Sequence, residues 1–177
     1  DSAFMKKVEQ LVIQPTIAGL KKEKIDYKGF VFIGLMNVKG EPYVIEYNAR
    51  MGDPETEVVM PRLKTDLGEL FIALDKGTID NIPVVFDDRA CATIVAVSGG
   101  YPGEYEKNKA IVFNEDAMDT SGNALIFHAG TRYDERGILV TNGGRVLAAS
   151  AFGTTIADAV KISAKALTNI QFEGMYF

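Results

Sequence analysis

Residues 43–57 read YVIEYNARMGDPETE, and this stretch decides the fold of the first half of the chain. On a β-strand the side chains of Glu46, Asn48 and Arg50 point to one face, because side-chain direction alternates from residue to residue. The alternate residues between Tyr43 and Ala49 are apolar or aromatic and take the other face. One face of the predicted strand therefore carries an acid, an amide and a guanidinium.

The polar face suits a hard divalent cation beside a phosphate. Mg²⁺ takes oxygen ligands at about 2.0–2.1 Å and usually completes its shell with water and substrate phosphates. We therefore expect Glu46 and Asn48 to be the metal ligands. Arg50 is the expected catalytic cation, since a planar guanidinium pairs well with a phosphate or carboxylate. A turn and an acid follow at Gly52 and Asp53.

Two structural alternatives remain open from spacing alone. The polar residues of this strand could form the solvated face of an edge hairpin. Asp53 and Pro54 could serve only as a helix start, because Asp is a common N-cap and Pro is favoured at the first helical position.

The composition bounds the class of protein. The 177 residues are 47% hydrophobic and 24% charged, with a net charge of −5, which fits one or two globular domains and argues against a nucleic-acid partner. One cysteine, Cys91, and one histidine, His128, exclude a disulfide within the chain and two-histidine metal motifs, and they fit a reducing cytoplasm. The uncharged runs are too short for a membrane helix, so no membrane partner is expected.

The first half predicts helices around one hairpin. A helix opens the chain and is kinked or restarted at Pro15, and a second helix ends at Gly77. Pro61 is expected to end the helix that Asp53 begins. The predicted hairpin strands are residues 30–38 and 43–50, joined by a turn at residues 39–42. In both helices, apolar residues recur at the spacing of one helix face. They are Phe4, Val8, Leu11 and Val12 in the first, and Leu67, Leu70, Phe71 and Leu74 in the second.

The second half predicts a small antiparallel sheet. Short apolar runs alternate with glycine turns at residues 92–98, 110–113, 125–128, 138–141 and 146–151. Asn142, Gly143 and Gly144 predict a hairpin turn, and residues 155–169 predict a closing helix with Ile156, Val160, Ala164 and Leu167 on its packed face. The fold class is therefore α+β, and a boundary within residues 82–88 divides it into domains 1–87 and 88–177.

The whole chain resembles a known family. The strings are GLM at residues 34–36, VIEYNARMGDPETEVVMPRLKTDLGEL at 44–70, SGGYPG at 98–103, FHAGT at 127–131 and GGRVLAASAFGTTIADA at 143–159. They are similar to the C-terminal part of glycinamide ribonucleotide synthetase, an ATP-grasp enzyme of purine synthesis. The resemblance implies the end of an ATP-grasp unit, an antiparallel sheet with helices, followed by a small antiparallel C-terminal domain with a closing helix.

The resemblance also implies an activity and roles for residues. The reaction joins glycine to 5-phosphoribosylamine with ATP as co-substrate, through a glycyl phosphate, and yields glycinamide ribonucleotide, ADP and phosphate. Glu46 and Asn48 would hold Mg²⁺ or Mn²⁺ against the ATP phosphates. Arg50 and the segment with Gly52, Asp53 and Glu55 would lie near the two other substrates.

Several expectations concern the protein as a whole. The chain starts at Asp1 rather than Met, so we expect it to be a piece of a longer protein. The resemblance implies that the N-terminal portion of the enzyme is missing and that the chain alone is inactive. We also expect a cytoplasmic location and a monomer. Cys91 is expected to be buried and inert, and His128 to lie outside the site. The alternatives are another ATP-grasp carboxylate–amine ligase, a biotin-dependent carboxylase, or a non-catalytic binding module derived from the same fold.

Overall fold

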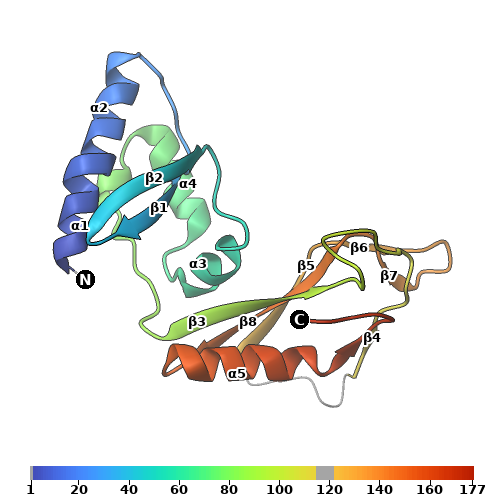
Figure 1. The fold of residues 1–177 in the computed structure, drawn as a ribbon. Helices are drawn as coiled ribbons and strands as arrows, with labels where there is room; N and C mark the ends of the chain where they lie inside the picture. Colours follow the sequence, from blue (N-terminus) through green and yellow to red (C-terminus); the bar gives the residue numbers. More distant parts are fainter. Residues whose placement is uncertain (1, 115–121) are drawn as a thin grey trace. The chain divides into compact units, whose positions relative to one another are not determined.

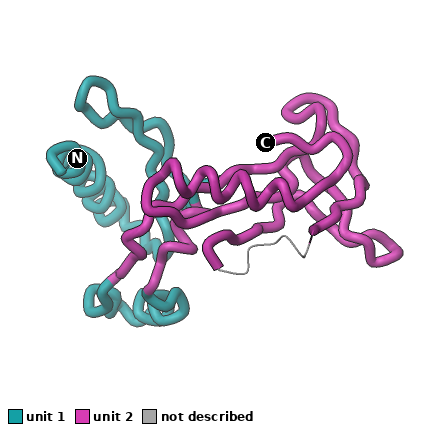
Figure 2. The backbone as a smooth tube through the Cα atoms, turned by 90° about the horizontal axis from the view of Figure 1, so that it is seen from below, with its two compact units in different colours: residues 1–55, 65–83 teal, residues 56–64, 84–177 magenta. Residues whose placement is uncertain are grey.

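The computed structural model describes residues 2–114 and 122–177. The chain forms two compact units, which are described separately: unit 1 holds residues 1–55 and 65–83, and unit 2 holds residues 56–64 and 84–177 (Figure 2). The boundary between residues 87 and 88 stays a prediction. Among the described residues, no helix has both the length and the apolar character that crossing a membrane requires.

Unit 1 opens with a helical run that is interrupted near Pro15, as predicted. Its parts are α1 (Ser2–Val8), the π-helical η1 (Glu9–Ile13) and α2 (Gln14–Lys22) (Figure 1). Pro15 lies in the first turn of α2, where its missing N–H costs little. Val8 and Val12 are buried, but Leu11 of the predicted face is 59% exposed.

The predicted hairpin is present with shorter strands. It consists of β1 (Phe32–Val38) and β2 (Glu41–Asn48), paired antiparallel. The turn is only Lys39 and Gly40, which both have left-handed φ values, 53° and 86°, as tight hairpin turns require. The expected second strand was too long, because β2 ends at Asn48 and the chain bends at Ala49 and Arg50. The register shifts between Gly34 and Leu35, which marks a β-bulge on the facing strand.

The helices after the hairpin correct one prediction and confirm another. α3 (Thr56–Arg62), part of unit 2, begins too late for Asp53 to be its N-cap, and Pro61 lies inside it, one residue before its end. α4 (Leu67–Lys76) is capped by Asp66, which accepts the Glu69 N–H at 2.9 Å, and it ends at the left-handed Gly77 as predicted. A short 3₁₀ turn, η2 (Ile79–Asn81), follows.

Unit 2 is built on a three-stranded antiparallel sheet. Its order is β3 (Ala90–Val97), β8 (Arg145–Gly153) and β5 (Ala124–His128), so the longest strand is central. α5 (Ile156–Leu167) lies along one face of this sheet (Figure 1). Two smaller pairs complete the unit: β4 (Val112–Phe113) with β9 (Ile170–Gln171), and β6 (Thr131–Tyr133) with β7 (Leu139–Thr141).

The packed face of α5 agrees with the predicted one only at Leu167. Ile156 is 71% exposed and Val160 42% exposed. The buried residues of α5 are Ala159, Ser163, Ala166 and Leu167. A Cβ at Gly153 would lie 3.0 Å from the Cα of Ala159, so the helix approaches the sheet too closely for large side chains.

The residues Asn142, Gly143 and Gly144 do not form a hairpin turn, which corrects the prediction. They join β7 to β8, and these strands belong to different sheets. Gly143 is needed for close approach instead, because a Cβ there would lie 3.0 Å from the Cα of Gly130.

Candidate metal and phosphate site on the β1–β2 hairpin

The hairpin register brings the two predicted metal ligands to one face. Glu46 lies directly opposite Gly34, and Asn48 lies directly opposite Phe32. Directly opposed residues of an antiparallel pair share a face, and so do residues two positions apart on one strand. Glu46 and Asn48 therefore share a face of the hairpin, and Phe32 and Gly34 of β1 complete it.

Glu46 extends over the glycine of the neighbouring strand. A Cβ at Gly34 would lie 3.0 Å from Cγ of Glu46 and 3.7 Å from its Oε1. Glu46 as a whole is exposed. The carboxylate is thus on the surface of the hairpin and accessible to a ligand.

Asn48 carries an unsatisfied polar atom. Its Nδ2 is buried and has no hydrogen-bond partner among the described residues. A buried polar group without a partner is uncommon and calls for an explanation, and a ligand is one explanation. The carboxylate and amide oxygens of Glu46 and Asn48 fit a hard cation such as Mg²⁺.

The described residues offer this cation few protein ligands. Within residues 2–114 and 122–177, no group of three or more His, Cys, Asp or Glu residues is placed to hold a metal ion. A Mg²⁺ ion bound by one or two carboxylates and by substrate phosphates would not need such a group. The donor set therefore fits a metal that arrives with a nucleotide.

Arg50 is placed differently from the prediction. It lies beyond the end of β2, so it does not continue the face of Glu46 and Asn48 as a strand residue. Its guanidinium donates a hydrogen bond to the carbonyl of Met51 at 2.9 Å, and the residue is exposed. The bend of the backbone after Asn48 is the reason, since the period of two applies only within the strand.

The segment after Arg50 returns towards β1. Gly52 is buried, and a Cβ there would overlap the Oε2 of Glu55 and lie 2.7 Å from Cε2 of Phe32. Glu55 therefore places its carboxylate beside the ring that faces Asn48. Asp53 lies in the turn between these residues.

Sequence reasoning missed the two β1 residues of this face. Phe32 and Gly34 carry no reactive group, so no chemical motif includes them, and Gly34 stands out only as the first residue of the GLM string at residues 34–36. These two residues are found only from the register of the hairpin. Deriving that register requires the position of the turn and the position of the bulge. Only the structure supplies these.

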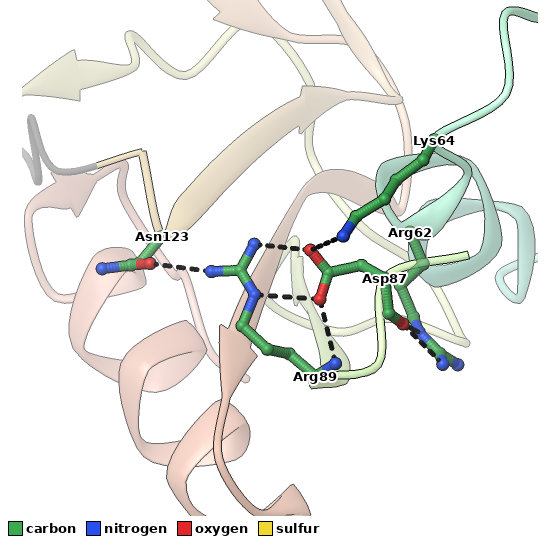
Figure 3. Close-up of polar contacts among 5 residues, drawn as sticks. All are labelled: Arg62, Lys64, Asp87, Arg89 and Asn123. Carbon is green, nitrogen blue, oxygen red and sulfur yellow. Dashed lines mark hydrogen bonds and ion pairs between the residues drawn. The ribbon is translucent and has the colours of Figure 1, made fainter. Parts of the chain in front are cut away.

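A second polar cluster surrounds Asp87 in unit 2 (Figure 3). Arg89 donates hydrogen bonds to both carboxylate oxygens of Asp87, at 3.0 and 2.9 Å, and the Lys64 Nζ lies 3.8 Å from the Asp87 Oδ2. These bonds from Arg89 hold the pKa of Asp87 well below its usual range. Arg62 donates twice to the Asp87 carbonyl, at 3.0 and 2.9 Å. The Asp87 carboxylate is thus paired with Arg89, and the bonds from Arg62 to the Asp87 carbonyl connect the end of α3 to the segment before β3.

Two other singled-out residues have structural surroundings. The His128 Nδ1 lies 3.0 Å from the Thr131 hydroxyl, and its ring is 6.3 Å from that of Phe113. Cys91 is half-buried rather than buried as expected, and this partial burial raises the pKa of its thiol, which favours the neutral form. Both surroundings agree with leaving these residues out of the site.

Comparison with family models gives two matches of one family. Residues 2–56 match the ATP-grasp (A) domain of phosphoribosylglycinamide synthetase, and residues 91–177 match the C domain of the same synthetase. The first match contains the hairpin, and the second contains the sheet of β3, β8 and β5 except for Ala90.

Curated relatives extend over nearly the whole chain. A phosphoribosylamine–glycine ligase of Chlorobaculum tepidum is 45% identical over 97% of the chain, which covers 40% of that protein. The ligase of Caldanaerobacter subterraneus is 38% identical over 100% of the chain and 41% of its own length. A bifunctional purine biosynthetic protein of Schizosaccharomyces pombe is 40% identical over 98% of the chain and 22% of its own length.

Solved structures give the same result. The phosphoribosylamine–glycine ligase of Thermotoga maritima aligns with a TM-score of 0.85 at 35% identity, over 99% of this chain and 42% of that one. The N5-carboxyaminoimidazole ribonucleotide synthetase of the same organism aligns over 90% of this chain and 41% of its own, with a TM-score of 0.53 at 15% identity, which shows a shared fold alone. The chain thus spans about 40% of the length of the ligases it matches. The chain has the α+β fold of this ATP-grasp group and belongs to the phosphoribosylglycinamide synthetase family.

Proposed function

We propose that this chain supplies the metal- and phosphate-binding hairpin and the C-terminal domain of a phosphoribosylamine–glycine ligase. The reaction is the ATP-dependent ligation of glycine to 5-phosphoribosylamine, which gives glycinamide ribonucleotide, ADP and phosphate. The observation that carries the proposal is the hairpin register, which puts the Glu46 carboxylate and the Asn48 amide on one face. The names of the relatives support the substrates.

Each predicted site residue has a role in this proposal. Glu46 and Asn48 hold Mg²⁺ or Mn²⁺, which when bound neutralises charge on the ATP phosphates. Arg50, on the bend after β2, is the cation that contacts a phosphate or carboxylate of the substrates. Gly52, Asp53 and Glu55 bind substrate in the segment that follows.

The chemistry asks for positioning rather than for a protein nucleophile. A carboxylate oxygen of glycine attacks the γ-phosphorus of ATP, and ADP leaves with the electrons of the broken P–O bond. The amine nitrogen of phosphoribosylamine then attacks the carbonyl carbon of the acyl phosphate, loses a proton and expels phosphate. The protein contributes mainly by orienting the reactants and by stabilising negative charge.

The remaining parts of the proposal concern the whole enzyme. Residues 1–87 form the end of the ATP-grasp domain and residues 88–177 the C-terminal domain. The relatives are more than twice as long, so turnover requires parts of the ligase outside this chain. We propose a monomeric cytoplasmic enzyme that binds small-molecule substrates.

The test is substrate-dependent ADP formation by the longest protein that carries this chain. The proposal predicts ADP formation that needs both glycine and phosphoribosylamine and that falls about 100-fold in Glu46→Gln. Glu41→Gln is the matched control, since Glu41 lies on the same strand and pairs with Lys7 instead. ADP formation that ignores either substrate would indicate another ATP-grasp ligase or a carboxylase. Nucleotide binding without any turnover would indicate a binding module.

A further inference from the structure

Gly34 and Gly52 differ from the turn glycines of unit 1. Gly40 and Gly77 have left-handed φ values of 86° and 69°, and nothing lies within 4 Å of where their Cβ atoms would be. Those two positions need glycine for its backbone freedom. Gly34 and Gly52 have no such φ value, so their backbone conformation is open to other residues. What these two positions lack is space.

The space above Gly34 is taken by Glu46. A Cβ at Gly34 would lie 3.0 Å from Cγ of Glu46, and 3.7 Å from both its backbone N and its Oε1. Glycine within a strand is unfavourable and often marks a close approach. Here the approaching group is the side chain of the proposed metal ligand.

The space above Gly52 is taken by two side chains. One is the Oε2 of Glu55, and the other is the Phe32 ring, whose Cε2 would lie 2.7 Å from the added Cβ. Phe32 faces Asn48 across the hairpin. The second glycine therefore lets a second carboxylate lie beside the Asn48 face.

We propose that Gly34 and Gly52 are positioning residues, which seat the Glu46 and Glu55 carboxylates on the face of the hairpin that carries Asn48. The inference rests on the proposed function. An alanine at position 34 would push the Glu46 side chain aside by a few tenths of an ångström. Mg²⁺ demands near-ideal octahedral geometry, so a small displacement of one ligand weakens binding.

The first experiment measures affinity for Mn²⁺ in the presence of ATP, by electron paramagnetic resonance of free Mn²⁺, in the longest protein that carries this chain. Gly34→Ala is expected to weaken Mn²⁺ binding about 10-fold, as the loss of groups that orient metal ligands does elsewhere. Gly52→Ala displaces Glu55, a proposed substrate residue, so it should raise the KM for glycine or phosphoribosylamine and leave the Mn²⁺ affinity unchanged. Glu41→Gln is the control, because Glu41 lies on the same strand as Glu46 and pairs with Lys7 instead. It should keep the parental affinity.

The second experiment reads the contact itself, without metal. Gly34→Ala should lower the melting temperature by about 2–4 °C when Glu46 is present. In a Glu46→Ala background, which lacks Cγ, the same change should lower it by less than about 1 °C. Far-UV circular dichroism verifies that every variant is folded.

The outcomes separate this inference from the proposed function. Parental Mn²⁺ affinity in Glu46→Ala would contradict the proposed function. Lost affinity in Glu46→Ala but parental affinity in Gly34→Ala, or parental KM values in Gly52→Ala, would overturn this inference alone. An equal drop in melting temperature with and without Glu46 would also overturn it, because the effect of Gly34 would then not act through Glu46.

Discussion

The β1–β2 hairpin of unit 1 and the β3–β8–β5 sheet of unit 2 are both antiparallel, yet they use their side chains differently. In β8 every residue from Val146 to Gly153 is buried. In β2 only Pro42 and Asn48 are even partly buried. The central strand of unit 2 is therefore constrained by packing on both faces, whereas the hairpin strand leaves most of its side chains, including that of Glu46, accessible.

This difference predicts that substitutions in the two regions will affect different properties of the protein. A change in β8 removes packed apolar volume and should appear as lost stability. A change on the Asn48 face of the hairpin should appear as lost binding or turnover, with little effect on unfolding. The experiments below test this division.

The largest expected effect on stability is at the centre of unit 2. Leu147 is fully buried on β8, so Leu147→Ala should lower the free energy of unfolding by about 2–5 kcal/mol, measured by urea denaturation. Ile45→Ala is the matched change in β2, where Ile45 is 62% exposed, and it should cost less than about 0.5 kcal/mol. Similar losses in both variants would contradict the comparison.

Asn48→Leu should do the opposite of Leu147→Ala. It removes the amide from the proposed site, and turnover of the protein that carries this chain should fall about 100-fold. Stability should stay unchanged or rise, because the buried Nδ2 has no partner to lose. Asn48→Asp keeps a ligand oxygen and should retain more turnover than Asn48→Leu. A large drop in melting temperature for Asn48→Leu would show that the residue serves packing instead.

Asp87 tests whether the polar cluster of unit 2 serves stability. Arg89 holds the pKa of Asp87 well below its usual range, so the stabilisation is full above the ordinary aspartate pKa. It declines as the pH falls below that value and is gone below the lowered pKa of the folded state. Asp87→Asn should therefore lower the melting temperature by about 2–5 °C at pH 7, and the difference from the parent should shrink between pH 4 and the acid limit.

The exposed neighbour Asp88 provides the control for this pH dependence. Asp88→Asn should leave both the melting temperature and its change with pH close to the parent. If Asp87→Asn and Asp88→Asn behave alike, the cluster around Asp87 contributes nothing to folding.

The smallest effects should be the same in both units, since helix caps do not depend on the site. Asp66 caps α4 by accepting the Glu69 N–H, and Thr155 caps α5 by accepting the Asp158 N–H at 3.1 Å. Asp66→Ala and Thr155→Ala should each cost about 1 kcal/mol in urea denaturation. If Asp66→Ala leaves the free energy of unfolding unchanged while Thr155→Ala lowers it, α4 frays independently of the rest of the protein.

The elements of the fold follow from the sequence better than their packing does. The hairpin, the stop at Gly77 and the main strands of unit 2 come from local signals, namely turn residues and apolar periodicity. The packed face of α5 does not, because periodicity favours the large Ile156, whereas the close approach at Gly153 selects Ala159 and a hydrogen bond to the Ala92 carbonyl holds Ser163. Tertiary contact decides this choice, and no local pattern records it.

The same holds for the candidate site. The spacing of Glu46 and Asn48 places them on one face, and the register agrees. The prediction that the strand continues through Arg50 is wrong, because β2 ends at Asn48. The spacing of the residues does not reveal where a strand ends. Phe32 and Gly34 could be found only from the pairing of the two strands.

The most direct test of the central claim is a titration of Mn²⁺ into the longest protein that carries this chain, with ATP present, followed by electron paramagnetic resonance. Glu46→Gln should bind Mn²⁺ at least about 10-fold more weakly than the parent, while Glu41→Gln on the same strand should bind it normally. Equal affinity of the parent, Glu46→Gln and Glu41→Gln would contradict the assignment of the hairpin as the metal site.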